Sequence, residues 1–260
     1  MASEKPMGIT IKSSSELDLM REAGRIVGLA KLGVSNAIKP GVTTRTLDEI
    51  AEGIIRAEGA IPSFKGYGDP HNPFPASICA SINDEIVHGI PSNRVIDAGD
   101  IISVDVGAIW KGLHADSAFT LGVGSISKKA AKLIDVTRLS LEKGIEKAVI
   151  GNRIGDICFA IQTYAENEGY SLVRHYVGHG IGYSMHEDPQ VPNWGMEPGL
   201  GPLLKEGMAI AIEPMLNIGT YRTKVLNDGW TVATDDGELS AHFEHTVLIT
   251  TNGPEVTTRL

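Results

Sequence analysis

The sequence contains little cysteine and no long hydrophobic run. Its two cysteines, Cys79 and Cys158, are too few to form a disulfide framework in a chain of 260 residues, so we expect a reducing compartment. No apolar stretch approaches the ~20 residues that a membrane span requires. The start of the chain, MASEKPMGIT, lacks the apolar centre of a signal peptide. These absences argue against a disulfide-stapled secreted domain and a membrane protein, and we expect a soluble cytoplasmic protein.

An excess of basic residues is also missing. The formal net charge is −9 and the isoelectric point is near 5.4. Nucleic acid and anionic membranes bind to basic faces, so neither is expected as the main partner. Hydrophobic residues make up 42% of the chain and charged residues 21%, which is enough for a sizeable core under an ordinary surface.

The sequence does contain a repeated order of expected elements, in which two helices are followed by several strands. The helices are indicated by apolar residues at helical spacing, by the capping-box pair Ser13 and Glu16, and by glycines at their ends. The predicted helices span residues 13–41, 44–59, 127–149 and 154–169, and the predicted strands span residues 76–82, 100–109, 117–124, 208–216, 230–234 and 242–250.

Matching residues recur at a fixed spacing in the two halves of the chain. Gly41 and Gly151, each of which precedes the second helix of its half, lie 110 residues apart. We infer an internal duplication over about residues 14–125 and 126–260. No Ser- or Gly-rich linker separates the halves, so residues 1–260 are expected to form one domain.

Four acidic residues occupy matching places in this duplication. Asp105 and Glu213 each follow a glycine by six residues in an apolar, strand-like run, and Asp116 and Glu244 each follow a histidine by two. A single buried acid is most simply explained by an arginine partner or a backbone cap, because an unpaired buried carboxylate is costly. Four converging carboxylates instead need cations among them, and two divalent ions would balance their four charges.

The segment RHYVGHGIGYSMHEDP, residues 174–189, gathers imidazoles and glycines. It contains His175, His179 and His186, with glycine at every second position from 178 to 182. Imidazole is the commonest metal ligand and proton shuttle near neutral pH, and glycine permits close backbone approach. The segment is therefore either a metal or catalytic site, or a turn with solvated histidines. One imidazole beside four carboxylates suits Mn, Fe, Co or Zn, and two such ions bridged by hydroxide hydrolyse amides or esters.

The set Asp105, Asp116, His179, Glu213 and Glu244, together with the motifs GHGIG, IEPM and EHT, resembles the type I methionine aminopeptidases. The resemblance covers nearly the whole chain. It implies an α/β (α+β) fold, the pita-bread fold, with two pseudo-symmetric helix-helix-strand halves around a central antiparallel sheet. It also implies that these five residues bind two divalent metal ions, with Co, Mn, Fe, Zn and Ni all compatible.

The resemblance implies roles for three further groups. His88 of VHGIP would lie near the scissile amide nitrogen, and His186 of MHEDP would contact the substrate carbonyl oxygen. Glu213 would take a proton from a metal-bridging hydroxide. His175 would be neither a metal ligand nor a catalytic donor. The implied single-domain enzyme removes the initiator methionine from nascent proteins and peptides when the second residue is small.

A pocket for the methionine side chain is implied as well. Its residues would be Cys79, Tyr67, Trp230, Phe64 and Met185. The loop over residues 68–75, which contains Phe74, is longer than usual and has no direct match. Asn83 and Ser240 match residues near a monovalent-cation site, so a monovalent cation joins the expected cofactors.

Other hydrolases of the same fold and a non-catalytic binding module are the alternatives to this interpretation. Xaa-Pro aminopeptidases share the fold but carry a substantial extra N-terminal domain. Type II methionine aminopeptidases carry an extra segment between the matching histidine and glutamate, whereas His179 and Glu213 of this chain are only 34 residues apart. A binding module without catalysis would have lost metal ligands, whereas all five are present. The expected partners are N-terminal methionine peptides of nascent proteins, with transient ribosome contact, no specific nucleic acid and no membrane, and the chain is expected to be a monomer.

Overall fold

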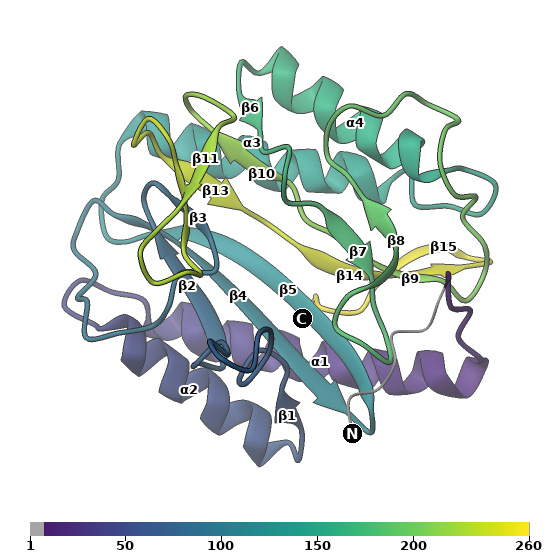
Figure 1. The fold of residues 1–260 in the computed structure, drawn as a ribbon, viewed down its shortest axis with the longest axis horizontal. Coiled ribbons are helices and arrows are strands. Elements are labelled where there is room, and N and C mark those ends of the chain that lie inside the picture. The colour runs from purple at the N-terminus through teal and green to yellow at the C-terminus, as the bar shows by residue number, and fades with distance from the viewer. Residues whose placement is uncertain (1–7, 260) are drawn as a thin grey trace.

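The computed structural model describes residues 8–259, in which two pairs of helices lie on opposite sides of a layer of strands (Figure 1). The helices are α1 (Ser14–Ala37), α2 (Thr44–Ala57), α3 (Lys128–Ile145) and α4 (Ile154–Asn167). The strands are β1 (Ile61–Pro62), β2 (Ile78–Ile82), β3 (Glu85–Val87), β4 (Ile101–Trp110), β5 (Leu113–Gly122), β6 (Ser171–Leu172), β7 (Gly178–Gly180), β8 (Glu187–Val191), β9 (Ala209–Ile212), β10 (Met215–Asn217), β11 (Thr223–Val225), β12 (Val232–Thr234), β13 (Ser240–His242), β14 (His245–Thr250) and β15 (Gly253–Val256).

All four predicted helices are confirmed and begin within one residue of their predicted starts, whereas α1 and α3 end four residues before their predicted ends. Ser13 caps α1, and its side chain and that of Glu16 form the reciprocal capping box. Gly41 and Gly151, before α2 and α4, have φ values of +91° and +92°, a conformation that glycine adopts without strain. Within residues 8–259 no helix is long and apolar enough to cross a membrane.

Across the described residues 8–259 the strands pair in antiparallel fashion and form four hydrogen-bonded sheets. One contains β1, β4 and β2, with β5 paired to β4; the largest runs in the order β15-β14-β9-β7-β8. Two three-stranded sheets have the orders β13-β10-β6 and β11-β12-β3. The long β4–β5 hairpin belongs to the first half of the chain, and β9 and β14 belong to the second half.

Two predicted strands are each interrupted at an acidic residue. The predicted strand 208–216 is two strands, β9 and β10, separated by Glu213 and Pro214. The predicted strand 242–250 is likewise broken, because Phe243 and Glu244 separate β13 from β14. Pro214 has no amide hydrogen to continue a sheet ladder. The two breaks meet, because the amide of Phe243 donates to the carbonyl of Pro214 over 3.3 Å. Glu213 and Glu244 therefore lie between strands, and the prediction of continuous strands through them was wrong.

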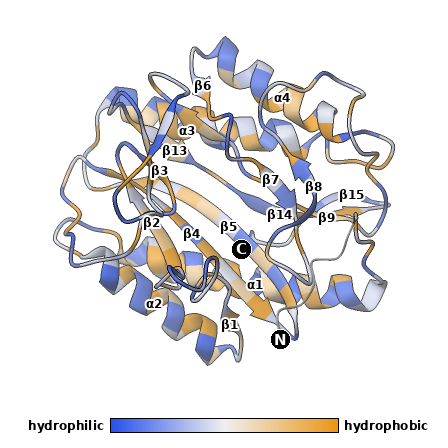
Figure 2. Cartoon of the chain, in the orientation of Figure 1, coloured by the Kyte–Doolittle hydropathy of each residue, from blue (hydrophilic) through white to orange (hydrophobic). Residues whose placement is uncertain are grey.

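Each helix pair buries its apolar face against the strands of its own half. In the first half Val27 of α1 and Ile55 of α2 pack with Val104 of β4, and in the second half Ile157 of α4 packs with Ile210 of β9. Figure 2 shows the same arrangement, with β2 and β4 mainly hydrophobic and the helices alternating between hydrophobic and hydrophilic residues. The strands are thus held from both sides, which gives a rigid support for side chains at their centre.

Candidate active site

One pocket, with a volume of about 120 Å³, is lined by residues from both halves of the chain. The structure brings together in it every residue that the sequence predicted for binding the divalent metals, for catalysis or for the methionine pocket. The lining residues are Phe64, Tyr67, Phe74, Cys79, His88, Asp105, Asp116, His179, Met185, His186, Glu213, Trp230 and Glu244.

The β4–β5 hairpin positions the two aspartates. Asp105 of β4 pairs with Ala118 of β5, and Asp116 of β5 pairs with Gly107 of β4. Residues that face each other across an antiparallel pair, and residues two apart on one strand, point to the same side of the sheet. Both carboxylates therefore point to the side of the hairpin opposite α1 and α2, where the pocket lies.

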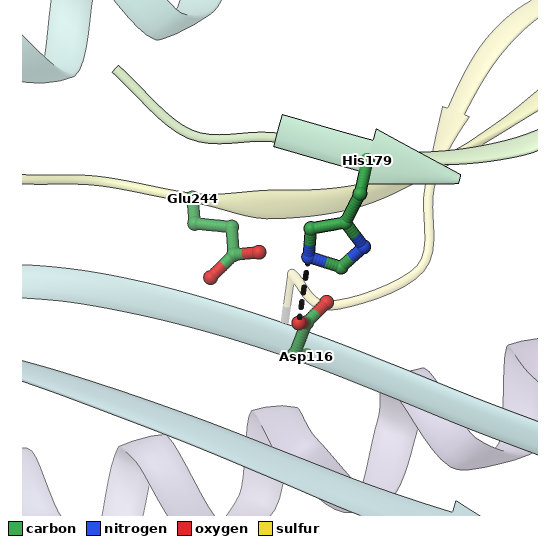
Figure 3. Close-up of side chains that lie close together, drawn as sticks. All are labelled: Asp116, His179 and Glu244. Atoms are coloured by element: carbon green, nitrogen blue, oxygen red, sulfur yellow. Dashed lines mark ion pairs between the residues drawn. The ribbon is translucent and has the colours of Figure 1, made fainter. Parts of the chain in front are cut away.

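His179 reaches the same place from β7 in the other half. Its Nε2 lies 3.6 Å from Oδ2 of Asp116 and 3.5 Å from Oε1 of Glu213. Figure 3 shows its ring pointing at Asp116, with Glu244 beside it. One ligand atom each from Asp116, His179 and Glu244 lies within 4.8 Å of the others.

The hydrogen bonding of His179 determines which ring nitrogen faces the acids. Its Nδ1 lies 2.9 Å from the carbonyl of Gly180, which can only accept a hydrogen bond, so Nδ1 carries the proton. Burial lowers the pKa of His179 to about 4, so the ring is neutral near pH 7. Nε2 therefore presents a lone pair to two carboxylates, an arrangement that a cation between them stabilises.

The carboxylates themselves show the same need for positive charge. Burial, reinforced by the charges of Asp116 and Asp105, raises the pKa of Glu244 and of Glu213 well above the usual range. Oδ1 of Asp105 and Oε1 of Glu244 are buried and have no hydrogen-bond partner within residues 8–259. A buried polar atom without a partner is costly, and metal coordination would satisfy both. The residues present thus fit a divalent metal.

The alternating glycines of the 178–182 segment allow neighbouring backbone to approach. A Cβ on Gly178 would lie 2.4 Å from the carbonyl oxygen of Ala211, and one on Gly180 would lie 2.1 Å from that of Asp188. Glycine therefore lets β7 fit closely between β8 and β9 and brings His179 to the acids. The neighbours at both positions are backbone atoms, so these two glycines permit the close backbone approach expected of this segment.

The two other predicted histidines flank the metal-ligand group. His88 has a φ of +60°, and burial lowers its pKa to about 4, so it is a neutral donor or acceptor. The hydroxyl of Tyr67 lies 2.5 Å from Nδ1 of His186, whose ring centroid is 4.2 Å from that of His179. His175 is exposed and does not line the pocket.

The apolar wall of the pocket includes the unmatched loop at residues 68–75. Phe74 is 2% exposed and packs edge-on against Trp230, with ring centroids 5.2 Å apart. The indole Nε1 of Trp230 donates to the carbonyl of Asn72 over 3.0 Å. This loop therefore fixes the orientation of Trp230. It also contributes Phe74 to the wall, a residue for which the resemblance implied no role.

His242 lies at the site although the sequence reasoning did not assign it a role. Its Nε2 lies 3.7 Å from Oε2 of Glu213 and has no hydrogen-bond partner within residues 8–259. The sequence contains a signal for His242, because His242 precedes Glu244 by two residues just as His114 precedes Asp116 by two. Asn83 and Ser240 lie elsewhere: the Ser240 amide donates to the Asn83 carbonyl over 2.9 Å, and neither residue lines the pocket.

Comparison with known proteins agrees with this geometry. Residues 18–251 match metallopeptidase family M24. The methionine aminopeptidase of Clostridium acetobutylicum is 57% identical over 251 residues, 96% of this chain and 98% of that protein. Methionine aminopeptidase 1 of Bacillus subtilis is 54% identical over 252 residues, 97% of this chain and 100% of that protein.

A solved structure extends the similarity to the fold. The crystal structure of methionine aminopeptidase from Thermotoga maritima superposes with a TM-score of 0.94 at 44% identity, covering 97% of this chain and 100% of that one. The shared architecture is the pita-bread fold that the sequence predicted. The chain belongs to metallopeptidase family M24, and within it to the bacterial methionine aminopeptidases.

Proposed function

We propose that Asp105, Asp116, His179, Glu213 and Glu244 hold two divalent metal ions at which this enzyme works. The chain is a metal-dependent aminopeptidase that removes the N-terminal methionine from proteins and peptides. The observation that best supports the metal site is the lone pair of His179 Nε2, which faces two carboxylates at 3.5 and 3.6 Å. Four carboxylates and one neutral imidazole give the oxygen-rich ligand set that Mn, Fe, Co, Ni and Zn accept.

The side chains around this group supply the proton transfers and the orientation. Bound divalent ions contribute a polarised carbonyl and a water of lowered pKa. Glu213 takes a proton at its carboxylate. His186, held at Nδ1 by Tyr67, directs Nε2 toward the carbonyl oxygen of the substrate and stabilises the charge that develops there. Neutral His88 positions the amide nitrogen of the bond that is cleaved.

The apolar end of the pocket fits a methionine side chain. It is formed by Cys79, Phe64, Tyr67, Met185 and Trp230, with Phe74 added by the long loop. A charged side chain would be stranded there without a partner, so Lys or Glu in first position is excluded. The second residue must lie beside His88 with its amide held in register, which restricts it to small side chains.

The remaining expectations are proposals of the same kind. Residues 1–260 act as one catalytic domain with an internal repeat over about 14–125 and 126–260, and the chain works as a monomer in the cytoplasm. Its substrates are nascent chains, with transient contact with the ribosome. A monovalent cation near Asn83 and Ser240 completes the cofactor set.

A peptide panel tests this function. We expect Met-Ala-Ser, Met-Gly-Ser and Met-Ser-Ser to be cleaved well, Met-Leu-Ser and Met-Lys-Ser poorly, and norleucine-Ala-Ser detectably, since a hydrophobic slot separates one methylene by only ~1–3 kcal/mol. Chelation should abolish turnover, and added Mn²⁺ or Co²⁺ should restore it. Equal kcat/KM for Leu-Ala-Ser and Met-Ala-Ser would contradict the methionine pocket, and a preference for Xaa-Pro peptides would favour the other hydrolases of this fold.

A further inference from the structure

A lysine lies behind the carboxylate group, on the side opposite the pocket. Lys31 projects from α1, and its Nζ donates to the hydroxyl of Ser117 over 2.6 Å. Ser117 is next to Asp116 on β5, so its side chain points to the helix side of the sheet. The Ser117 hydroxyl in turn donates to the backbone carbonyl of Glu244. Two hydrogen bonds thus link the Lys31 ammonium to the backbone of a proposed metal ligand.

The surroundings of Lys31 leave its charge in a poorly solvated place. Burial lowers the pKa of the ammonium to about 8, against the opposing effect of Glu244 and Asp105. The ring of Phe119 lies on one side, with its centroid 5.9 Å from Nζ. Lys31 is therefore largely charged at neutral pH, with the carboxylates of Glu244 and Asp105 as the acids that act on it.

The neighbouring basic residues His245 and Arg259 do not supply a buried positive charge behind the carboxylates. Burial first, and then the charges of Lys31 and Arg259, lower the pKa of His245 to about 2, so His245 is neutral. The guanidinium of Arg259 is paired with Glu142, and its side chain is 49% exposed. Among the residues that the structure describes here, Lys31 is the cation with a hydrogen-bonded path to the ligand group.

We propose that Lys31 sets the affinity of the metal centre through its charge. This inference rests on the proposed two-metal site. A fixed positive charge behind the carboxylates stabilises them when metal is absent and opposes the entry of further positive charge, above all at the site that fills second. The chain thereby binds its second ion less tightly than five ligands alone would bind it, and that ion exchanges more readily.

The test compares Mn²⁺ binding by full-length variants after chelation, using calorimetric titration. Lys31→Gln removes the charge and keeps a donor for Ser117, and Lys31→Arg keeps the charge. Lys31→Gln should bind the weaker Mn²⁺ about tenfold more tightly, equivalent to ~1.4 kcal/mol. Its metal-free form should also melt at a lower temperature. Lys31→Arg should match wild type in both measurements.

Two controls separate charge from geometry. Ser117→Ala breaks the hydrogen-bonded path and leaves the charge, so its Mn²⁺ affinity should stay within about threefold of wild type. Lys39→Met removes one exposed positive charge from the surface beyond α1 and should leave the affinity unchanged. Lys31→Met provides a second uncharged variant if the Gln variant does not fold.

Three results would overturn the proposal for Lys31. They are unchanged affinity in both uncharged variants, weaker binding in them, or the same change in Ser117→Ala as in Lys31→Gln. Each can be distinguished from failure of the proposed function, because that failure appears in the wild type, as a protein that does not bind two Mn²⁺ ions.

Discussion

The buried ion pair between Lys12 and Glu187 ties the start of the described chain to the segment that carries His186. Nζ of Lys12 lies 2.8 Å from Oε2 of Glu187, and the two side chains are 1% and 0% exposed. Thr10 also donates to this oxygen over 2.5 Å, and the amide of Ser184 donates to Oε1 over 3.0 Å. We predict that Lys12→Met destabilises the fold strongly and slows catalysis.

The size of the effect follows from the burial. Removing one partner of a buried pair leaves the other charge uncompensated and costs ~3–5 kcal/mol. In a chain of this size each kcal/mol lowers the melting temperature by about 2–4 °C, so the loss should be roughly 6–20 °C. Because Glu187 is next to His186, kcat on Met-Ala-Ser should fall about tenfold at a temperature where the variant is folded, as small misplacements of reacting groups are costly.

Two further variants give this prediction its controls. Lys129→Met breaks an ion pair with Glu238 whose side chains are 60% and 47% exposed, and should cost at most ~1 kcal/mol. The double variant Lys12→Met/Glu187→Leu leaves no buried charge and should recover most of the lost stability. The assay is urea unfolding of the metal-loaded proteins. A loss in Lys12→Met no larger than in Lys129→Met would refute the reasoning, as would a double variant no more stable than Lys12→Met.

Three substitutions test the proposed roles at the site. Glu213→Gln should lower kcat by at least ~10²-fold at saturating metal. The melting temperature of the metal-free variant should be no lower than that of the wild type, because one repulsive carboxylate is gone. Near-normal turnover would show that the proton goes elsewhere. His186→Ala should lower kcat by ~10²–10³-fold with metal affinity nearly unchanged in calorimetry, and the opposite pattern would make it a ligand. His88→Asn should lower kcat without moving the acid limb of the pH profile between pH 5 and 7, because the pKa of His88 is only about 4 and the ring is already neutral there; a limb that disappears in the variant would contradict this.

The helices and the grouping of the acids could be predicted because their signals are local or repeated. The capping pair of Ser13 and Glu16 and the glycines before α2 and α4 act within a few residues, so their sequence positions fix the boundaries. The duplication then indicates that Asp105 and Glu213 occupy equivalent places, since equivalent chain segments fold alike.

The details that the sequence could not supply depend on contacts between distant segments. The apolar run through Glu213 gives no sign of where its sheet ladder ends, apart from Pro214. The bond from Trp230 to Asn72 joins residues 158 positions apart, so nothing near either residue predicts it. Lys31 has the ordinary appearance of a surface lysine on a helix, and only the packing of α1 against β5 gives it Ser117 as a partner.

Anomalous diffraction from crystals grown with Mn²⁺ tests the central claim most directly. The account predicts two peaks, roughly 3.5–4 Å apart, both within bonding distance of side chains from the set Asp105, Asp116, His179, Glu213 and Glu244, with Nε2 of His179 as the nitrogen ligand. A single peak at full metal loading, or a peak bound by other residues, would contradict the proposed two-metal centre.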